Sequence, residues 1–221
     1  MHLAIFAKYW TPGEAKTRLA KTLGPRAASR LARAFLKTTI SRLATVNATR
    51  YLVVSPDSSR RAFEHIARGR FQVALQRTGA LGERLQHWFE SRFTAGATRV
   101  VVLGADSPDV PLEYVKRAFA ELQHYQAVIG PARDGGYYLL GLRDRMLPLF
   151  EGIDWGTPAV FQQTLDRLRT SLADYSVLPE WYDVDTVNDL SLLCRNLATA
   201  KDDESCRGLL CTIRRVTSGW H

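Results

Sequence analysis

The stretch Val100–Pro111 reads VVVLGADSPDVP and determines the fold class. Its first four residues are apolar and mostly β-branched, which is typical of a strand buried on both faces of a sheet. Gly104 ends this strand, and Asp106 follows closely. In open α/β sheets, ligands bind beside the carboxyl ends of the strands. The stretch therefore predicts a central strand that brings an aspartate to a ligand site.

Apolar strands and amphipathic helices alternate on both sides of this stretch. Strands are predicted at 2–8, 51–54, 71–75, 127–130 and 137–142, and a last strand is predicted to end near 183–185. Helical spacing of apolar residues marks 25–46, 59–68, 81–93, 111–122, 157–172 and 187–198. This alternation predicts a layered α/β domain with a mainly parallel, mixed sheet. We expect residues 1–200 to form the domain and residues 201–221 a C-terminal appendage.

The composition fits a globular protein. The chain has 221 residues, of which 46% are hydrophobic and 24% charged, and this excludes a disordered, collagen-like or coiled-coil chain. Three cysteines are too few for a disulfide framework and favour reduced thiols. The N-terminal apolar run reaches Lys8 at once, and no apolar run of ~18 residues follows. We therefore expect a cytoplasmic protein without a membrane partner.

The positive charge is concentrated in one segment. The net charge is +8, and nine basic residues but only one acidic residue lie between Glu14 and Arg50. Four of the basic residues recur at helical spacing and share a face: Arg26, Arg30, Arg33 and Lys37. Such a segment suggests an anionic partner, either phosphate, nucleotide or nucleic acid. A solvated basic helix face is the alternative.

A loop rich in cations follows the first predicted strand. Residues 8–19 read KYWTPGEAKTRL. Backbone N–H groups around Gly13, together with the charges of Lys8, Lys16 and Arg18, could cradle a phosphate. With a single glycine, the loop is neither a Walker loop nor a dinucleotide fingerprint. An ordinary charged turn is the alternative.

Carboxylates follow two of the predicted strands. Asp106 follows the strand at 100–103, and Asp183 and Asp185 lie in WYDVDT at 181–186. Mg²⁺ or Mn²⁺ prefers carboxylate oxygens and keeps waters and substrate phosphates as further ligands. Two neighbouring carboxylates repel each other, so we expect the metal-free site to be destabilised. Alternatively, Asp106 and Asp185 only cap the helices that follow them.

Two further loops carry glycines and aromatic residues. Residues 131–138, PARDGGYY, join two strands, and their Asp134-Gly135-Gly136 turn would let the backbone approach a ligand closely. Tyr137 follows this turn, and Trp155 lies in GIDWGT at 152–157. A plain β-hairpin turn is the alternative for the first loop, because Asp-Gly is its usual signature.

Taken in order, these segments resemble a known family. The loop at 8–19, GADSPD at 104–109, GPARDGGYYLLG at 130–141, IDWGTP at 153–158 and DVDT at 183–186 resemble the rSAM/selenodomain-associated transferases. Members have glycosyltransferase-A architecture and are often labelled arsenosugar-biosynthesis-type glycosyltransferases. The chain is more remotely similar to 2-phospholactate guanylyltransferase and molybdenum-cofactor guanylyltransferase. The resemblance covers residues 2–198.

The resemblance implies a three-layer nucleotide-diphospho-sugar transferase fold and a nucleotide bound across the first half of the sheet. Lys16 and Arg18 would contact its phosphates, and Gln76, Gly79 and Gly82 in QRTGALG would border its base. Asp106 would bind the metal with Asp185, while Asp183 is the less favoured second ligand. The acceptor side would be lined by Asp134, Gly135, Gly136, Tyr137 and Trp155.

The implied reaction is a metal-dependent transfer from a nucleotide-activated substrate. Glycosyl transfer from a nucleotide sugar to a small-molecule acceptor is favoured, with Lys16 and Arg18 stabilising the leaving phosphate and Asp134 as general base. The opening loop lacks the paired glycines of nucleotidyltransferases, and residues 104–107 are not the Asp-x-Asp of many glycosyltransferases. Nucleotidyl transfer from an NTP, with pyrophosphate release, is the second possibility. A non-catalytic basic module that binds nucleic acid is the third, although we expect no nucleic-acid partner.

Overall fold

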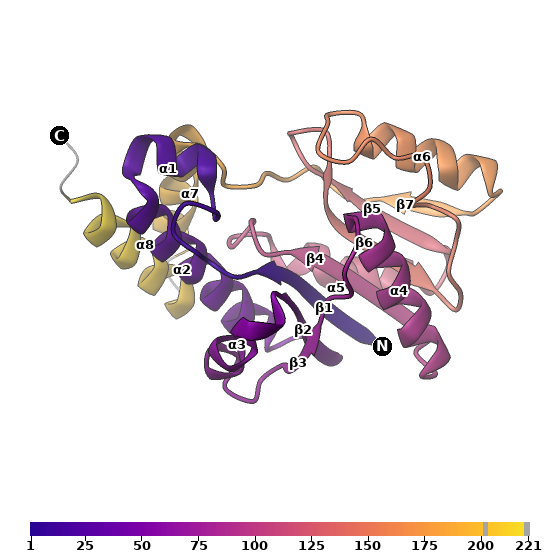
Figure 1. The fold of residues 1–221 in the computed structure, drawn as a ribbon. Helices are drawn as coiled ribbons and strands as arrows, with labels where there is room; N and C mark the ends of the chain where they lie inside the picture. Colours follow the sequence, from indigo (N-terminus) through magenta and orange to yellow (C-terminus); the bar gives the residue numbers. More distant parts are fainter. Residues whose placement is uncertain (201–202, 219–221) are drawn as a thin grey trace.

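A computed structural model describes residues 1–200 and 203–218 (Figure 1). It confirms the predicted α/β class, because seven strands form one sheet in the order β3-β2-β1-β4-β6-β5-β7. Residues 201–202 and 219–221, which belong to the predicted appendage, lie outside the described residues.

The sheet is mixed but mainly parallel. Its strands are β1 (His2–Lys8), β2 (Thr49–Ser55), β3 (Gln72–Leu75), β4 (Arg99–Gly104), β5 (Ala127–Pro131), β6 (Tyr137–Arg143) and β7 (Tyr175–Val177). Strand β6 runs antiparallel to β4 and β5, and all other neighbours pair in parallel. The carboxyl ends of β1, β2 and β4 therefore meet at one edge of the sheet.

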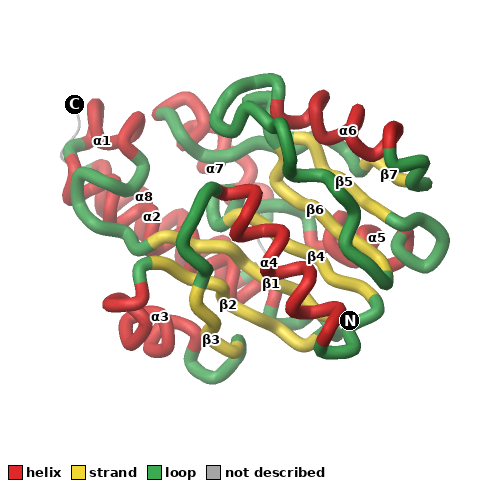
Figure 2. The backbone as a smooth tube through the Cα atoms, turned by 45° about the vertical axis from the view of Figure 1, so that its right-hand side comes forward, coloured by secondary structure: helices red, strands yellow, loops and turns green. Residues whose placement is uncertain are grey.

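Helices cover both faces of the sheet (Figure 2). The helices are α1 (Thr17–Leu23), α2 (Pro25–Leu43), α3 (Arg60–Ala67), α4 (Leu81–Thr94), α5 (Leu112–Glu121), α6 (Val160–Thr170), α7 (Val187–Thr199) and α8 (Glu204–Thr217). Leu3 and Ile5 of β1 pack with side chains of α2, α3 and α5, whereas Ala4 packs with those of α4 and α6. This alternation follows from the two-residue period of a strand.

A third apolar cluster lies on the outer side of α2. Leu31 and Phe35 of α2 are buried there with side chains from α1, α7 and α8. Figure 1 shows these helices gathered at the left of the sheet. Cys206 and Leu209 of α8 are buried in this cluster, so the part of the C-terminal segment that the structure describes packs directly on α2.

The last predicted strand is wrong. Residues 183–185 are not in a strand, and the segment pairs with the sheet only through an isolated bridge between Ala132 and Trp181. Tyr182 and Val184 alternate as in a strand, but they are buried in the helical cluster beside α7 and α8. The true edge strand, β7, has three residues and no buried one, so it lacks a readable pattern.

Asp203 fixes the start of α8, and its removal is expected to loosen this helix. Its Oδ1 accepts from the backbone N–H groups of Ser205 and Cys206, and its Oδ2 accepts from Arg42 Nε at 2.9 Å. Burial alone would raise the pKa of Asp203, but the Arg42 hydrogen bond and the Cys206 backbone bond hold it below its ordinary value. The stability that this pair contributes is thus present above the unfolded-state pKa of about 4 and is lost as the pH falls through the folded-state value.

We expect Asp203→Ala to lower the free energy of unfolding by about 2–3 kcal/mol at pH 7, since it removes an N-cap and a charged hydrogen bond. Urea denaturation at pH 7 and at pH 3 measures the effect, which shrinks at the lower pH. Asp203→Asn is the matched control, because it keeps the cap and loses only the charge. A full-sized loss that persists at pH 3 would contradict the role of the ion pair.

Candidate functional site

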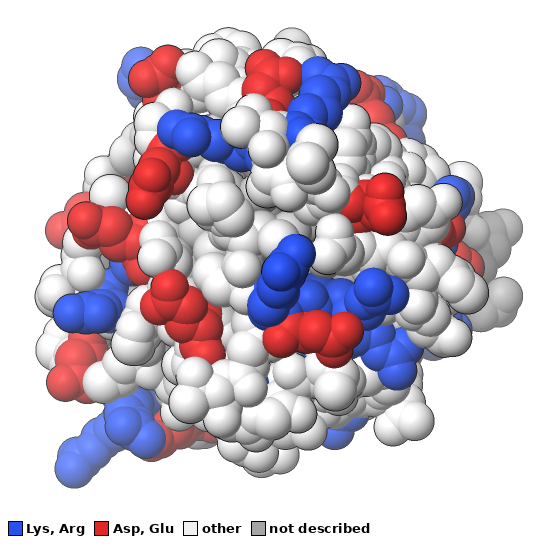
Figure 3. All heavy atoms as spheres, turned by 90° about the vertical axis from the view of Figure 1, so that its right-hand side faces the viewer, with Lys and Arg blue, Asp and Glu red and all other residues white. Residues whose placement is uncertain are grey.

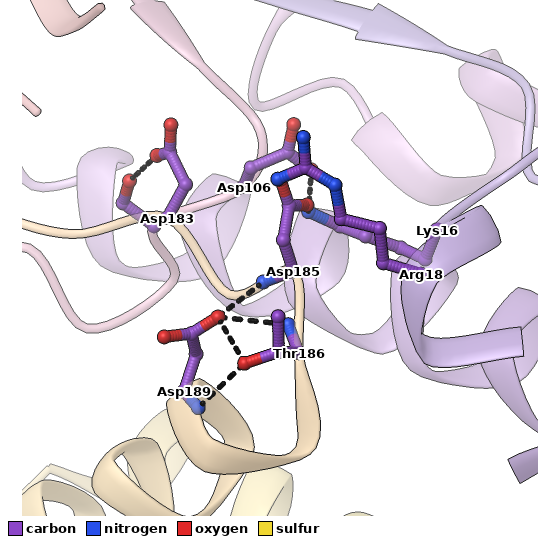
Figure 4. Close-up of polar contacts among 8 residues, drawn as sticks. Lys16, Arg18, Asp106, Asp183, Asp185, Thr186 and Asp189 are labelled. Carbon is purple, nitrogen blue, oxygen red and sulfur yellow. Dashed lines mark hydrogen bonds and ion pairs between the residues drawn. The ribbon is translucent and has the colours of Figure 1, made fainter. Parts of the chain in front are cut away.

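The end of β4 and the segment before α7 meet at the carboxyl edge of the sheet. Asp106 follows β4, and its carbonyl oxygen accepts from the Val184 N–H at 3.0 Å. This backbone bond places Asp185 beside Asp106. Figure 4 shows the two carboxylates facing the side chains of Lys16 and Arg18, which come from the loop after β1 and the start of α1.

Lys16 lies between the two aspartates. Its Nζ is 2.6 Å from Asp106 Oδ1 and 3.0 Å from Asp185 Oδ1, and its side chain is only 5% exposed. Burial by itself lowers the pKa of Lys16, but the two carboxylates outweigh it and raise the pKa above the ordinary value. The expectation of two mutually repelling carboxylates is therefore corrected, because a buried ammonium group neutralises them.

The backbone at Lys16 is unusual for a lysine. Its φ of 49° and ψ of 51° are left-handed, a conformation that costs an L-residue roughly 1–2 kcal/mol. Lys16 is also the N-cap of α1, where its side chain makes no capping bond. The strained conformation directs the ammonium group to the aspartates, and such strain is frequent at functional sites.

Arg18 and Lys8 are more open than Lys16. Arg18 Nη1 is 3.5 Å from Asp185 Oδ2, and 66% of its side chain is exposed. Lys8 is exposed at the end of β1, and Gly13 takes a φ of 91° in the turn that begins at Thr11. Arg18 is therefore positioned to contact a ligand beside the carboxylates.

The bulky residues of the opening loop fix it to the helices below. The rings of Tyr9 and Trp10 contact each other at a tilt, and both pack edge-on against Phe63 of α3. Ser29 of α2 donates its hydroxyl to the Trp10 carbonyl, and the Arg33 guanidinium lies over the Trp10 ring. This anchoring explains a Tyr-Trp pair in a loop that also carries Lys16.

Neither aspartate caps the helix that follows it. Helix α7 is capped by Thr186, whose hydroxyl accepts from the Asp189 N–H while Asp189 Oδ2 accepts from the Thr186 N–H. Helix α5 begins after Pro111 without a side-chain cap. The side chains of Asp106 and Asp185 are free of that structural task and point to Lys16 instead (Figure 4).

Asp183 points away from Lys16. Ser107 Oγ donates to its Oδ1, and Figure 4 shows this carboxyl separated from the pair formed by Asp106 and Asp185. Burial raises the pKa of Asp183 to about 6, and the nearby charges of Asp106 and Asp134 add to the effect. The geometry thus places Asp185, not Asp183, opposite Asp106, and it places Asp134 within electrostatic range of the site.

Asp109 is a structural residue that the sequence analysis missed. Its carboxylate accepts from Tyr182 Oη, from Asn196 Nδ2 at 2.9 Å and from Trp181 Nε1 at 3.4 Å. Burial, and then the charge of Asp109, raise the pKa of Tyr182. The network joins the loop after β4 to the segment 181–185, so Asp109 positions Asp185 beside Asp106. The only signal in the sequence was a second aspartate in GADSPD.

The residues predicted to border the base lie in the loop between β3 and α4 and in the first turn of α4, which contains Gly82. Gln76 Nε2 donates to the carbonyls of Ala7 and Val53, and its Oε1 accepts from Arg84, so its amide is occupied by protein groups. A Cβ at Gly79 would collide with the Glu83 carboxylate, and one at Gly82 would lie 3.0 Å from the Trp155 ring. Gly82 therefore brings the predicted base loop and the predicted acceptor loop together.

The loops predicted to bind the acceptor also contact each other. A Cβ at Gly135 would lie 2.2 Å from the Pro158 carbonyl oxygen, so this close approach requires glycine. Asp134 is exposed, and one of its carboxylate oxygens accepts from the Gly136 N–H. The ring of Tyr137 makes a T-shaped contact with Trp155, while its hydroxyl is buried without a hydrogen-bond partner among the described residues.

Within residues 1–200 and 203–218, no cluster of three histidine, cysteine or acidic side chains could hold a metal ion by itself. A metal at this site would thus depend on two carboxylates and on ligands from the substrate or solvent. Over the same described residues, no helix is both long and apolar enough to span a membrane.

The fold and its strand-end site define an α/β domain of the nucleotide-diphospho-sugar transferase fold. The family described as "Uncharacterized protein conserved in bacteria (DUF2064)" matches residues 27–157, and the chain belongs to this family. The comparisons thus support this broader family, and they do not confirm the more specific resemblance to the rSAM/selenodomain-associated transferases. A comparison with proteins of curated function gives no significant match.

Solved structures support the same fold. A Desulfovibrio desulfuricans G20 protein, provisionally assigned as a nucleotide-diphospho-sugar transferase, is 36% identical with a TM-score of 0.88, and 97% of each chain is covered. A cytidylyltransferase from Leptospira borgpetersenii is 15% identical with a TM-score of 0.57, covering 98% of this chain and 94% of that one. The 4-diphosphocytidyl-2C-methyl-D-erythritol synthase from Anaerococcus prevotii is 13% identical, with a TM-score of 0.56 and coverage of 87% and 93%. The last two show the fold alone.

Proposed function

We propose that this protein is a metal-dependent transferase that acts on a nucleotide-activated substrate. The observation that carries the proposal is the convergence of Asp106, Asp185 and buried Lys16 at the carboxyl edge of β1 and β4, with exposed Arg18 beside them. This edge is the position at which open α/β sheets bind their ligands.

The donor set is compatible with a divalent cation. Two carboxylate oxygens, one each from Asp106 and Asp185, lie within 3.0 Å of the same cationic atom, Lys16 Nζ. Mg²⁺ and Mn²⁺ are suited to one or two carboxylates supplemented by waters and substrate phosphates. In our proposal, Asp106 and Asp185 would hold Mg²⁺ or Mn²⁺, and the Lys16 ammonium group would then be available to the substrate phosphate. The ion would supply neutralisation of phosphate charge.

The chain's own cations would complete the phosphate site. Lys16 and Arg18 stabilise the negative charge that develops on the leaving phosphate, which is a major source of rate in such transfers. Asp134 takes the proton of the acceptor hydroxyl, and Trp155 lies on the acceptor side of the site. The acceptor oxygen forms the new bond to the sugar carbon, the bond from that carbon to phosphate oxygen breaks, and its electron pair stays on the phosphate.

Glycosyl transfer to a small-molecule acceptor is the first candidate. It is supported by the provisional assignment of the 36% identical D. desulfuricans protein. Nucleotidyl transfer from an NTP is the second candidate, because the fold is shared with a cytidylyltransferase and a 4-diphosphocytidyl-2C-methyl-D-erythritol synthase. The two differ in their products: the first releases a nucleoside mono- or diphosphate, and the second releases pyrophosphate.

A screen for thermal stabilisation by nucleotides and nucleotide sugars, with and without Mn²⁺, tests the proposal. We expect one nucleotide class to raise the midpoint of unfolding, and Mn²⁺ to increase that shift. Incubation of the selected compound with candidate acceptors, followed by separate assays for pyrophosphate and nucleoside phosphates, then distinguishes the two reactions. The absence of any Mn²⁺-dependent stabilisation across the whole screen would refute the proposed function.

Arg18 provides a specific test of the phosphate site. We expect Arg18→Ala to weaken nucleotide binding by about 1.5–3 kcal/mol, the range for a hydrogen bond to a charged group. The fold should be unaffected, because Arg18 is exposed and makes only a 3.5 Å contact with Asp185. Calorimetric titration of the nucleotide found in the screen measures the change. Lys21→Ala, which removes an exposed cation from the same helix, is the control and should bind as the wild type does.

A further inference from the structure

A second basic region lies apart from the strand-end site, in a hollow between α2, α3 and α8. Its volume is about 730 Å³. Six Lys and Arg side chains line it, namely Arg30, Arg33, Lys37, Arg68, Arg70 and Arg215, together with a single acidic side chain, Glu204. We call this hollow the basic groove. None of the residues predicted to contact phosphate at the opening loop, the base, the metal or the acceptor lines it.

The charges of the basic groove are hardly neutralised. Among the described residues, none of its six cationic side chains forms an ion pair; Arg33 lies over Trp10, and Arg70 donates to Ser41 Oγ. By contrast, the face shown in Figure 3, on the side of α4 and α6, carries basic and acidic side chains mixed together. Like charges gathered around one hollow raise its positive potential and attract anions.

The rest of the groove can accommodate the body of a ligand. Ile66 and Leu209 contribute apolar surface, and Thr38 contributes a hydroxyl group that can donate to a phosphate oxygen. The Ser205 hydroxyl also lines the groove, where it donates to Ser41 Oγ. The volume lies within the range of pockets that bind small molecules, roughly 300–1,000 Å³. The groove thus combines size, donors and charge in the way that a multiply charged anion requires.

Arg68 lines the groove at an energetic cost to the fold. It ends α3 with a φ of 48°, in the left-handed conformation that favours glycine at the end of a helix. Its backbone N–H bonds to Glu64, but its exposed side chain makes no hydrogen bond or ion pair with a described residue. Local packing does not explain an arginine at this position, whereas an anionic ligand would.

We propose that the basic groove binds a small molecule that carries at least two phosphate groups, at a site separate from the strand-end site. A nucleic acid fits the observations less well, because the cations come from α2, from α8 and from the turn after α3, and they enclose a bounded hollow. A nucleic-acid backbone would require a longer cationic track with stacking side chains. The inference does not rest on the proposed transferase function.

Titration calorimetry with inorganic tripolyphosphate, in metal-free buffer at ~100 mM salt, tests the proposal. We expect the double variant Arg30→Gln/Lys37→Gln to bind at least about tenfold more weakly than wild type, a loss of about 1.4 kcal/mol or more, because it removes two of the six cations that line the groove. The control Arg26→Gln/Lys116→Gln removes the same charge from exposed positions outside the groove and should bind within about twofold of wild type.

A further arm separates the groove from the strand-end site. Arg18→Ala removes a cation of the strand-end site that does not line the groove, so it should leave tripolyphosphate binding to the groove unchanged. Loss of binding in Arg18→Ala but not in Arg30→Gln/Lys37→Gln would assign the anion to the strand-end site and overturn the proposal. Failure of wild-type protein to bind tripolyphosphate would also overturn it.

Arg68→Gly excludes a folding artefact. Glycine adopts the left-handed conformation readily, so the variant should unfold at the same or a higher temperature than wild type. At the same time, its tripolyphosphate affinity should fall. If a stable Arg68→Gly protein bound tripolyphosphate as tightly as wild type, Arg68 would not contact the anion, and ligand binding would not explain its left-handed backbone.

Filter binding to mixed DNA and RNA tests whether the groove binds nucleic acid instead. At ~150 mM salt we expect only weak, steeply salt-dependent retention of nucleic acid. The groove would instead be a nucleic-acid site if wild-type protein retained nucleic acid tightly but did not bind tripolyphosphate, and if Arg30→Gln/Lys37→Gln lost that retention.

Discussion

Replacing Asp106 by Asn is expected to abolish the Mn²⁺ enhancement of nucleotide binding and to lower turnover by about 10²-fold or more. The variant keeps the size of the side chain but removes one of the two carboxylates that converge on Lys16 Nζ. A metal supplies several kcal/mol of transition-state stabilisation, and each 1.36 kcal/mol is about a tenfold change in rate. Metal and nucleotide must strengthen each other's binding equally, because binding linkage is reciprocal.

Calorimetric titrations of nucleotide into wild type and Asp106→Asn, each with and without Mn²⁺, measure this coupling. The matched control is Asp144→Asn: Asp144 is exposed, lies after β6 and takes a φ of 62°, which asparagine tolerates. The control should retain the full Mn²⁺ effect. An equal Mn²⁺ effect in Asp106→Asn and wild type would remove Asp106 from the metal site and, with it, most of the proposed mechanism.

The stability of the metal-free variant carries separate information. If the two carboxylates only repelled each other, Asp106→Asn would stabilise the metal-free protein. The structure instead places the buried Lys16 ammonium group between them, so the variant leaves that cation with one carboxylate partner. We therefore expect the metal-free variant to be equally or less stable than wild type, as measured by thermal unfolding.

The fold was predictable where apolar periodicity is strong. Strands such as β1 and β4 are buried on both faces, and α4 has a clear apolar stripe. Helix α1 was missed because Leu19 is its only buried residue, and β7 was missed because it has none. Short or exposed elements are formed by tertiary contacts, which a local pattern does not contain.

The candidate site was predictable in its parts but not in its pairings. Asp106, Lys16 and Arg18 were singled out because each follows a predicted strand, and the parallel sheet brings such positions to one edge. Asp185 was singled out on a predicted strand that is absent, and the backbone bond from Val184 to Asp106 brings it to the same edge instead. That Lys16 contacts the aspartates depends on its left-handed backbone and its burial. Neither feature has a signal in the sequence, since a lysine is not the residue that this conformation usually selects.

The role of Asp109 could not be read from the sequence either, and its truncation is expected to have the largest effect on stability. We expect Asp109→Ala to lower the free energy of unfolding by about 3–4 kcal/mol, because the buried Tyr182 hydroxyl and the half-buried Asn196 and Trp181 donors lose an acceptor. Each buried donor left without a partner costs roughly 1–3 kcal/mol, and the long Trp181 contact should contribute least. Urea denaturation monitored by circular dichroism measures the loss.

A double-mutant cycle identifies the network as the cause. Tyr182→Phe removes the hydroxyl that donates to Asp109, so the double variant with Asp109→Ala should lose less stability than the sum of the single variants. Because the network holds the segment 181–185 beside Asp106, Asp109→Ala should also weaken the Mn²⁺ effect although Asp109 does not contact Lys16. If Asp109→Ala lowered the free energy of unfolding by less than about 1 kcal/mol, it would behave like a substitution at an exposed position. Asp185 would then be held in place by the Asp106–Val184 backbone bond and the capped helix α7, without help from Asp109.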